Sequence, residues 1–191
     1  MVGVTSPLFR GGDVRGGFAL AGWYVVGTAI SATVILFGVS VLSLGAVAVP
    51  TGVRGALLAA CVGVLLVLDA FGRTPRTNRQ TPQRMRLASP SARGFVWGLD
   101  IGVLFTTIKV TSLVWVLLLL GIVDPDRAPL AIAVFYATYL LAEAVAVVVD
   151  LSLGPQVFLV MQGKGFQYAA RTLSVILLVP VAVAAYTGAF W

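Results

Sequence analysis

The sequence contains no histidine, a single cysteine and very few charges. Of its 191 residues, 10% are charged and 59% are apolar, and the mean hydropathy is +1.01. A soluble domain carries roughly 25% charged residues, so this composition does not suit a water-soluble globule. We therefore predict an integral membrane protein.

These missing residue types exclude several chemistries. Without histidine the chain cannot form a bis-histidine haem site, a histidine-ligated zinc site or an imidazole base. Cys61 alone cannot form an internal disulfide or a dithiol relay, and it lies in an apolar run, where a thiol behaves as a small hydrophobe. We expect no metal and no cofactor. An enzyme that uses Asp or Glu as a base stays open but is not favoured.

Apolar segments divide the chain into five predicted spans. A helix needs about 20 residues to cross the hydrocarbon core. The 38 residues from Gly16 to Val53 carry no charge, which fits one long tilted span and a turn at Pro50. The predicted spans cover residues 18–44, 53–72, 95–123, 130–149 and 168–190. The expected fold is all-α, a polytopic membrane helix bundle that forms one domain over residues 1–191.

Two connections between these spans are more polar than the rest. Residues 73–94 contain six arginines, three prolines and no acid, and we expect a basic loop there. Residues 150–167 contain Pro155 and an apolar piece that is too short to cross a bilayer. This second connection is predicted to be an interfacial or re-entrant segment.

The positions of the basic residues predict an orientation. With the N-terminus in the cytoplasm, ten Lys and Arg residues lie inside, two lie outside, and Lys109 lies within the membrane. Positively charged loops are retained on the cytoplasmic side. We expect a multi-pass protein of the cell membrane with its N-terminus inside and its C-terminus outside.

The basic loop predicts partners as well. Its arginines fit the anionic lipids of the inner leaflet at about 1 kcal/mol per charge, and an acidic cytoplasmic partner is an alternative. Nucleic acid is not expected, because the positive residues lie between apolar runs. The arginines assigned to this loop, beyond Arg73 at its start, are Arg76, Arg79, Arg84, Arg86 and Arg93.

The charges inside the predicted spans need a physical explanation. Each costs on the order of 3 kcal/mol, so it should face the protein interior and have a partner. Lys109 lies about 21 Å into a membrane about 30 Å thick. Glu143 lies at a matching depth, about 20 Å from the outer end of its span. We predict a pair between them, either structural or part of a transport site.

Other polar side chains extend this intramembrane polar site. Asp100 lies on the opposite side of the same helix as Lys109, which predicts a central position for that helix. Gly98 and Gly102 provide a small-residue spacing that allows close helix contact. Tyr136 and Tyr139 share one stripe with Glu143, so their hydroxyls can hydrogen-bond its carboxylate.

Asp69 has a simpler expected role. It lies close to the end of the second span, and Arg73 follows four residues later. This spacing predicts an ion pair on one helix face at the membrane interface.

Two functions follow from these features. The first is a non-catalytic membrane subunit that assembles with a larger complex through its helix faces and basic loop. The alternative is a small permease, alone or as an oligomer, which moves an ion or small polar solute through a site around Lys109 and Glu143. A hetero-complex favours the first function and a homo-oligomer the second.

Overall fold

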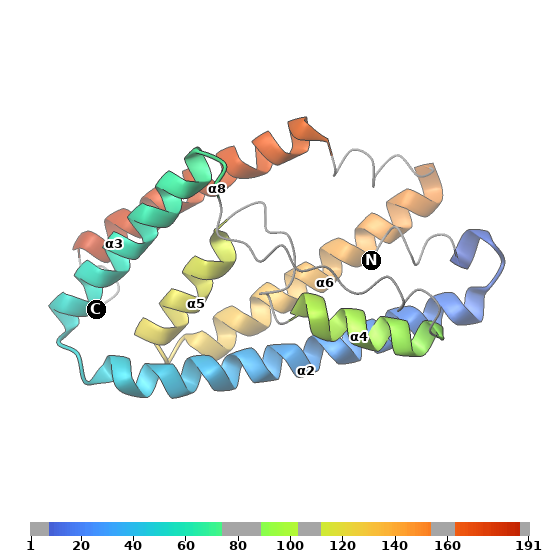
Figure 1. The fold of residues 1–191 in the computed structure, drawn as a ribbon, viewed down its shortest axis with the longest axis horizontal. Helices are drawn as coiled ribbons and strands as arrows, with labels where there is room; N and C mark the ends of the chain where they lie inside the picture. Colours follow the sequence, from blue (N-terminus) through green and yellow to red (C-terminus); the bar gives the residue numbers. More distant parts are fainter. Residues whose placement is uncertain (1–7, 74–88, 103–111, 154–162, 188–191) are drawn as a thin grey trace. The chain divides into compact units, whose positions relative to one another are not determined.

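The computed structural model describes residues 8–73, 89–102, 112–153 and 163–187, and most of these residues lie in helices (Figure 1). No strand occurs among the residues so described. The helices are α2 (Val14–Val47), α3 (Thr51–Ala70), α4 (Pro90–Gly102), α5 (Leu113–Val123), α6 (Ala128–Leu153) and α8 (Lys164–Thr187).

Four of these helices are long and apolar enough to cross a membrane, which indicates a membrane protein. They are α2, α3, α6 from Ala128 to Ser152, and α8. With 34 residues, α2 is about 51 Å long, longer than the bilayer core is thick. An all-helical chain with four candidate membrane helices agrees with the predicted fold class at this level.

The third predicted span, residues 95–123, is described only at its two ends. There α4 has 13 residues and α5 has 11, so each is shorter than the roughly 20 residues that a crossing needs. Residues 103–111 between them lie outside the described residues. The count of five spans therefore stays a prediction.

Several helix ends differ from the predicted ones because of local capping. In α4, Ser89 accepts a hydrogen bond from the amide of Ala92 at 3.3 Å, and Pro90 takes the first helical position. Arg93 therefore lies in α4 and not in a loop. The connection predicted over 150–167 is shorter as well, since α6 continues to Leu153 and α8 starts at Lys164.

The chain divides into two compact units, which we describe separately. Unit 1 contains residues 1–34, 77–107 and 133–166, and unit 2 contains residues 35–76, 108–132 and 167–191. Both α2 and α6 contribute to each unit. The predicted single domain stays a prediction.

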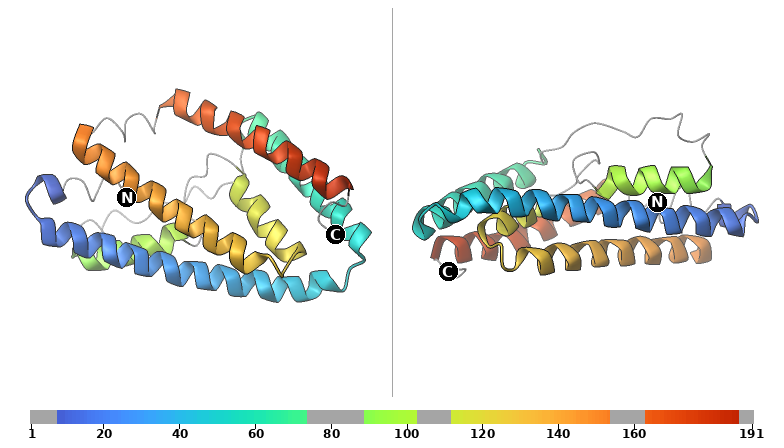
Figure 2. Two further views of the ribbon diagram at one scale, coloured as in Figure 1. Left: turned by 180° about the vertical axis from the view of Figure 1, so that it is seen from behind. Right: turned by 90° about the horizontal axis from the view of Figure 1, so that it is seen from below.

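In unit 1, α4 lies against the N-terminal half of α2 (Figure 2). A Cβ added at Gly98 would meet the carbonyl oxygen of Tyr24 and lie 2.9 Å from the amide nitrogen of Thr28. A Cβ at Gly94 would lie 3.0 Å from the Cα of Leu20. The two glycines therefore allow backbone-to-backbone contact, the same kind of packing that the sequence predicts for Gly98.

Hydroxyl groups of α2 reinforce this crossing. Ser31 donates a hydrogen bond to the carbonyl of Leu99 at 2.9 Å, and Thr28 donates to the carbonyl of Gly98 at 3.5 Å. On the exposed face of α2, Thr33 donates to a carbonyl of its own helix at 3.0 Å. Polar groups of α2 are thus satisfied on both faces, as a membrane environment requires.

In unit 2, the helices α3, α5 and α8 (labelled in Figure 1) share an apolar core of buried side chains. Its centre consists of large and small aliphatic side chains that water does not reach. The buried members are Leu58, Val62, Val116, Leu178 and Ala185. The polar cluster described next joins the same three helices.

Candidate intramembrane polar sites

Asp69 of α3 is the centre of a fully buried polar cluster in unit 2. Its Oδ2 accepts hydrogen bonds from the amide of Ser112 at 2.7 Å and from the hydroxyl of Ser174 at 2.8 Å. Its Oδ1 accepts from the hydroxyl of Ser112 at 2.7 Å. All three residues are fully buried, at 0% relative exposure. One carboxylate thus joins α3, the start of α5 and α8.

The position of this carboxylate stabilises the first turn of α5. Ser112 is the N-cap of α5, and its side chain makes no capping bond of its own. Its hydroxyl instead donates to Asp69. The N-terminus of a helix carries partial positive charge and unpaired amides. Asp69 supplies the acceptor and the negative charge that a capping side chain of α5 would otherwise supply.

The C-terminal end of α5 contacts a positively charged side chain that also comes from α3. Arg54, near the start of α3, donates a hydrogen bond from Nη1 to the carbonyl of Val123 at 3.3 Å. Val123 is the last residue of α5, where the helix dipole is negative. Charges at both ends of α3 therefore match the dipole of the antiparallel α5, and each such contact contributes roughly 0.3–1 kcal/mol.

The end of α3 explains how Asp69 is held in place. Gly72 adopts a left-handed conformation with φ +67°, and its amide donates to the carbonyl of Asp69 at 2.9 Å. The amide of Arg73 donates to the carbonyl of Leu68 at 2.7 Å, which completes a Schellman motif. Arg171 of α8 lies against Gly72. The turn therefore orients Asp69 toward α5 and α8.

This environment differs from the one expected for Asp69. The sequence suggests an interfacial partner in Arg73, whereas the structure places the carboxylate in a buried cluster and leaves Arg73 exposed. The hydrogen bonds from Ser112 and Ser174 are contacts that sequence reasoning missed. The pair between Asp69 and Arg73 stays a prediction.

Unit 1 contains a second polar site, a chain of two tyrosines and a glutamate. Tyr139 donates a hydrogen bond to Oε1 of Glu143 at 3.2 Å, one helical turn along α6. The hydroxyls of Tyr24 and Tyr139 lie 2.9 Å apart, and either can be the donor. Tyr24, from α2, is fully buried. The chain therefore joins α2 to α6 inside unit 1.

The intramembrane residues predicted from sequence have different outcomes. The contact between Tyr139 and Glu143 is the hydrogen bond that their spacing allows. Tyr136 is buried on α6, and Asp100 is partly buried on α4. Lys109 lies outside the described residues, so its pair with Glu143 stays a prediction. Tyr24 was not predicted, because nothing in its local sequence distinguishes it from a packing residue.

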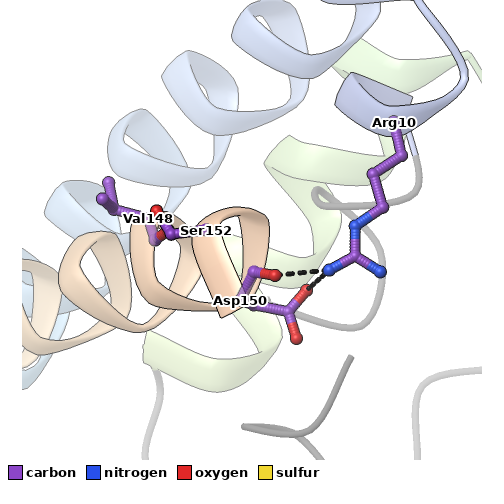
Figure 3. Close-up of polar contacts among 4 residues, drawn as sticks. All are labelled: Arg10, Val148, Asp150 and Ser152. Carbon is purple, nitrogen blue, oxygen red and sulfur yellow. Dashed lines mark hydrogen bonds and ion pairs between the residues drawn. The ribbon is translucent and has the colours of Figure 1, made fainter. Parts of the chain in front are cut away.

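The C-terminal end of α6 is tied to the chain segment that precedes α2 (Figure 3). Nη2 of Arg10 lies 3.1 Å from Oδ2 of Asp150 and also donates to the backbone carbonyl of Asp150. The side chain of Asp150 is nearly buried, whereas that of Arg10 is 36% exposed. This ion pair fixes the N-terminal segment against α6 within unit 1.

The basic loop is described only at its edges. Arg73 is exposed at the end of α3, and Arg93 lies in α4. The remaining loop arginines, Arg76, Arg79, Arg84 and Arg86, lie outside the described residues. Its lipid-binding role stays a prediction.

The described residues contain no group of three or more acidic or cysteine side chains that could hold a metal ion. No protein-family model matches the sequence, and no curated protein or solved structure is similar to it. The function must therefore be argued from the polar sites and the helix surfaces alone.

Proposed function

We propose that this chain is a non-catalytic integral membrane subunit, which assembles with a larger membrane complex through its helix faces and its basic loop. The observation that carries the proposal is the buried environment of one carboxylate, that of Asp69. Asp69 is fully buried and accepts hydrogen bonds from Ser112 and Ser174 of its own unit. A solute-binding carboxylate must be reachable from a pathway, whereas a buried and bonded one holds helices together.

Wide apolar surfaces support the same proposal. No more than 28% of the most apolar window of any of the four candidate membrane helices is buried within the chain. On α6, for example, Leu141, Val145 and Val148 are all exposed. Such faces contact lipid or another membrane protein, and we propose that at least one of them contacts a partner.

The proposed topology has five spans, with the N-terminus inside and the C-terminus outside the cell membrane. Its support is the ratio of ten to two in the positions of Lys and Arg. This orientation brings the basic loop to the anionic inner leaflet. It places the turn before α6 outside.

Cysteine labelling tests this topology. In a Cys61→Ser background, single cysteines replace Asp126 in the turn before α6 and Arg73 at the end of α3, both of which are exposed. An impermeant maleimide added to intact cells should label only the Asp126→Cys protein. The Arg73→Cys protein should react only after permeabilisation, and the reverse pattern would contradict the proposed orientation.

Tryptophan substitution tests the subunit proposal. Lipid-facing positions accept the large indole, whereas a face packed on a partner does not. Tryptophan is placed singly at Leu141, Val145 and Val148 of α6, and at Leu57 and Val64 as exposed positions of α3. At one face we expect loss of a stoichiometric partner while the chain stays inserted and helical. Val147→Trp, at a buried position of α6, should unfold unit 1 and serves as the control.

The permease is the second candidate, and a specific observation favours it. The chain from Tyr24 through Tyr139 to Glu143 connects polar atoms between two membrane helices. Ionisable groups inside membrane helices often mark ion or proton pathways. The permease would be favoured if the protein tolerated tryptophan at every exposed position and had no stoichiometric partner.

A further inference from the structure

The turn at the end of α3 holds a positive charge that the described part of the chain does not neutralise. Arg171 of α8 is partly buried against this turn, in unit 2. No ion pair and no side-chain hydrogen bond joins Arg171 to another of the residues that the structure describes. Arg73, exposed on the same turn, adds a second positive charge. Such a pair of guanidinium groups favours an anionic ligand.

The position of the Arg171 side chain is set by Gly72. A Cβ built at Gly72 would lie 2.8 Å from Nη1 and 3.1 Å from Cζ of Arg171, so the guanidinium packs where a larger residue would have a side chain. Of its three nitrogens, only Nε is buried without a partner. The two Nη groups have no described partner either, and they therefore reach the surface. These Nη groups are the donors that a ligand can use.

This turn lies at the level of the lipid headgroups. With 20 residues, α3 is about 30 Å long, which equals the thickness of the hydrocarbon core. Residues 71–73 follow directly, so they lie at the polar boundary in either orientation of the chain. The orientation proposed above brings them to the inner leaflet, where anionic lipids are found.

Exposed aromatic side chains lie next to the two arginines along the chain. Phe71, the C-cap of α3, is 78% exposed, and Tyr168, three residues before Arg171 on α8, is 64% exposed. Aromatic side chains at this level are typical of contacts with lipid. A ligand that carries both a phosphate and acyl chains fits this combination of charge and apolar surface better than a free anion does.

We propose that Arg171 and Arg73 bind the phosphate group of an anionic membrane lipid at the end of α3. The Nη groups of Arg171 donate hydrogen bonds to the phosphate oxygens, a geometry that the planar guanidinium favours. Arg73 contributes a second charge at the rim of the site. This site goes beyond the subunit role, since it gives the chain a lipid-binding site that needs no protein partner.

Quenching of a tryptophan by brominated lipids tests this site. The four native tryptophans are replaced by phenylalanine, and Phe71→Trp places a reporter beside the arginines. The full chain is reconstituted in mixtures of phosphatidylcholine and phosphatidylglycerol, with either lipid brominated in its acyl chains. The reporter should show a preference for phosphatidylglycerol. Arg171→Gln should lower this preference about five-fold, which corresponds to about 1 kcal/mol for one charge.

A second variant keeps the positive charge. Arg171→Lys lacks the paired donors of the guanidinium, so we expect it to lower the preference by about two-fold. This variant gives the answer if Arg171→Gln fails to fold, which far-ultraviolet circular dichroism would show. Because brominated lipid is present in both leaflets, the result depends neither on the orientation of the chain nor on a protein partner. A failure here is therefore distinct from a failure of the subunit proposal.

Matched controls separate a specific site from general attraction. Arg127→Gln changes an exposed arginine of unit 2 in the turn before α6, and it should leave the preference unchanged. A reporter at Tyr186, near the other end of α8 and 83% exposed, should show no such preference. An equal preference at Tyr186→Trp would contradict a site at the end of α3.

Two further results would overturn the proposal. If neither Arg171→Gln nor Arg171→Lys changed the preference at the Phe71→Trp reporter, the guanidinium would serve only to pack on the turn. Inorganic phosphate, compared with chloride at equal ionic strength, should leave the preference intact. Its loss in phosphate would show that the site takes the free ion and not a lipid.

Discussion

Replacement of Asp69 by alanine is expected to lower the free energy of unfolding by at least about 3 kcal/mol. The substitution leaves three donors without their acceptor in a fully buried site, namely the amide and hydroxyl of Ser112 and the hydroxyl of Ser174. Each unsatisfied buried donor costs about 1–3 kcal/mol. The start of α5 also loses the negative charge beside its N-terminus.

Chemical unfolding in detergent, followed by circular dichroism, measures this loss. Asp69→Asn keeps the shape of the side chain but provides one acceptor oxygen, so we expect a smaller loss of about 1–2 kcal/mol. Ser174→Ala removes one donor and should cost about 1 kcal/mol. In a double-mutant cycle, Ser174→Ala should cost less when Asp69 is already alanine.

A surface acid provides the comparison for this series. Asp126 is exposed in the turn before α6, and Asp126→Ala should change the stability by less than about 0.5 kcal/mol. If Asp69→Ala were equally harmless, the buried cluster would not hold α3, α5 and α8 together. Unit 2 would then depend on its apolar core alone.

Replacement of Gly98 by valine should separate α4 from α2 in unit 1. The added Cβ would meet the backbone of Tyr24 and Thr28, which cannot move aside as a flexible side chain can. Overpacking costs typically 1–3 kcal/mol, and we expect a loss near the upper end, about 3 kcal/mol. The hydrogen bonds from Thr28 and Ser31 to α4 should be lost with the contact.

Trp23 offers a local signal for this separation. Its ring lies edge-on to that of Phe95, with centroids 5.9 Å apart, so its emission reports the contact between α2 and α4. The measurement uses a protein in which the other three tryptophans are phenylalanine. Gly98→Val should shift the emission and lower the unfolding midpoint together.

Gly22 supplies the matched control on α2. Nothing lies within 4 Å of a Cβ built at this position. Gly22→Ala should therefore leave the Trp23 signal unchanged and stabilise the helix by up to about 1 kcal/mol. If Gly22→Ala lowered the stability as much as Gly98→Val, the close contact at Gly98 would not account for the loss.

Much of the fold follows from local patterns in the sequence. Uninterrupted apolar runs predict the four long helices, because a run of about 20 apolar residues marks a candidate membrane helix whatever its tertiary contacts. Helix ends are harder to place. Ser89 and Pro90 begin α4 inside a segment that its arginines and prolines mark as a loop, since capping depends on two residues and not on composition.

The sequence predicts those contacts of the polar sites that join residues close in the chain, and it misses those that join distant residues. Tyr139 and Glu143 are four residues apart on one helix, so helical geometry alone predicts their contact. Ser112 and Ser174 lie 43 and 105 residues from Asp69, and serine is common in membrane helices. Arg73, four residues from Asp69, was therefore the natural partner to choose. Only the tertiary arrangement of α3, α5 and α8 identifies the serines.

Native mass spectrometry after extraction in a mild detergent or in lipid discs tests the subunit proposal most directly. The account predicts a stoichiometric assembly of this chain with a different membrane polypeptide. The assembly should be lost on tryptophan substitution at one exposed helix face and kept in Asp126→Ala. A chain that occurs alone or only with copies of itself, and that tolerates tryptophan at every exposed position, would contradict the account.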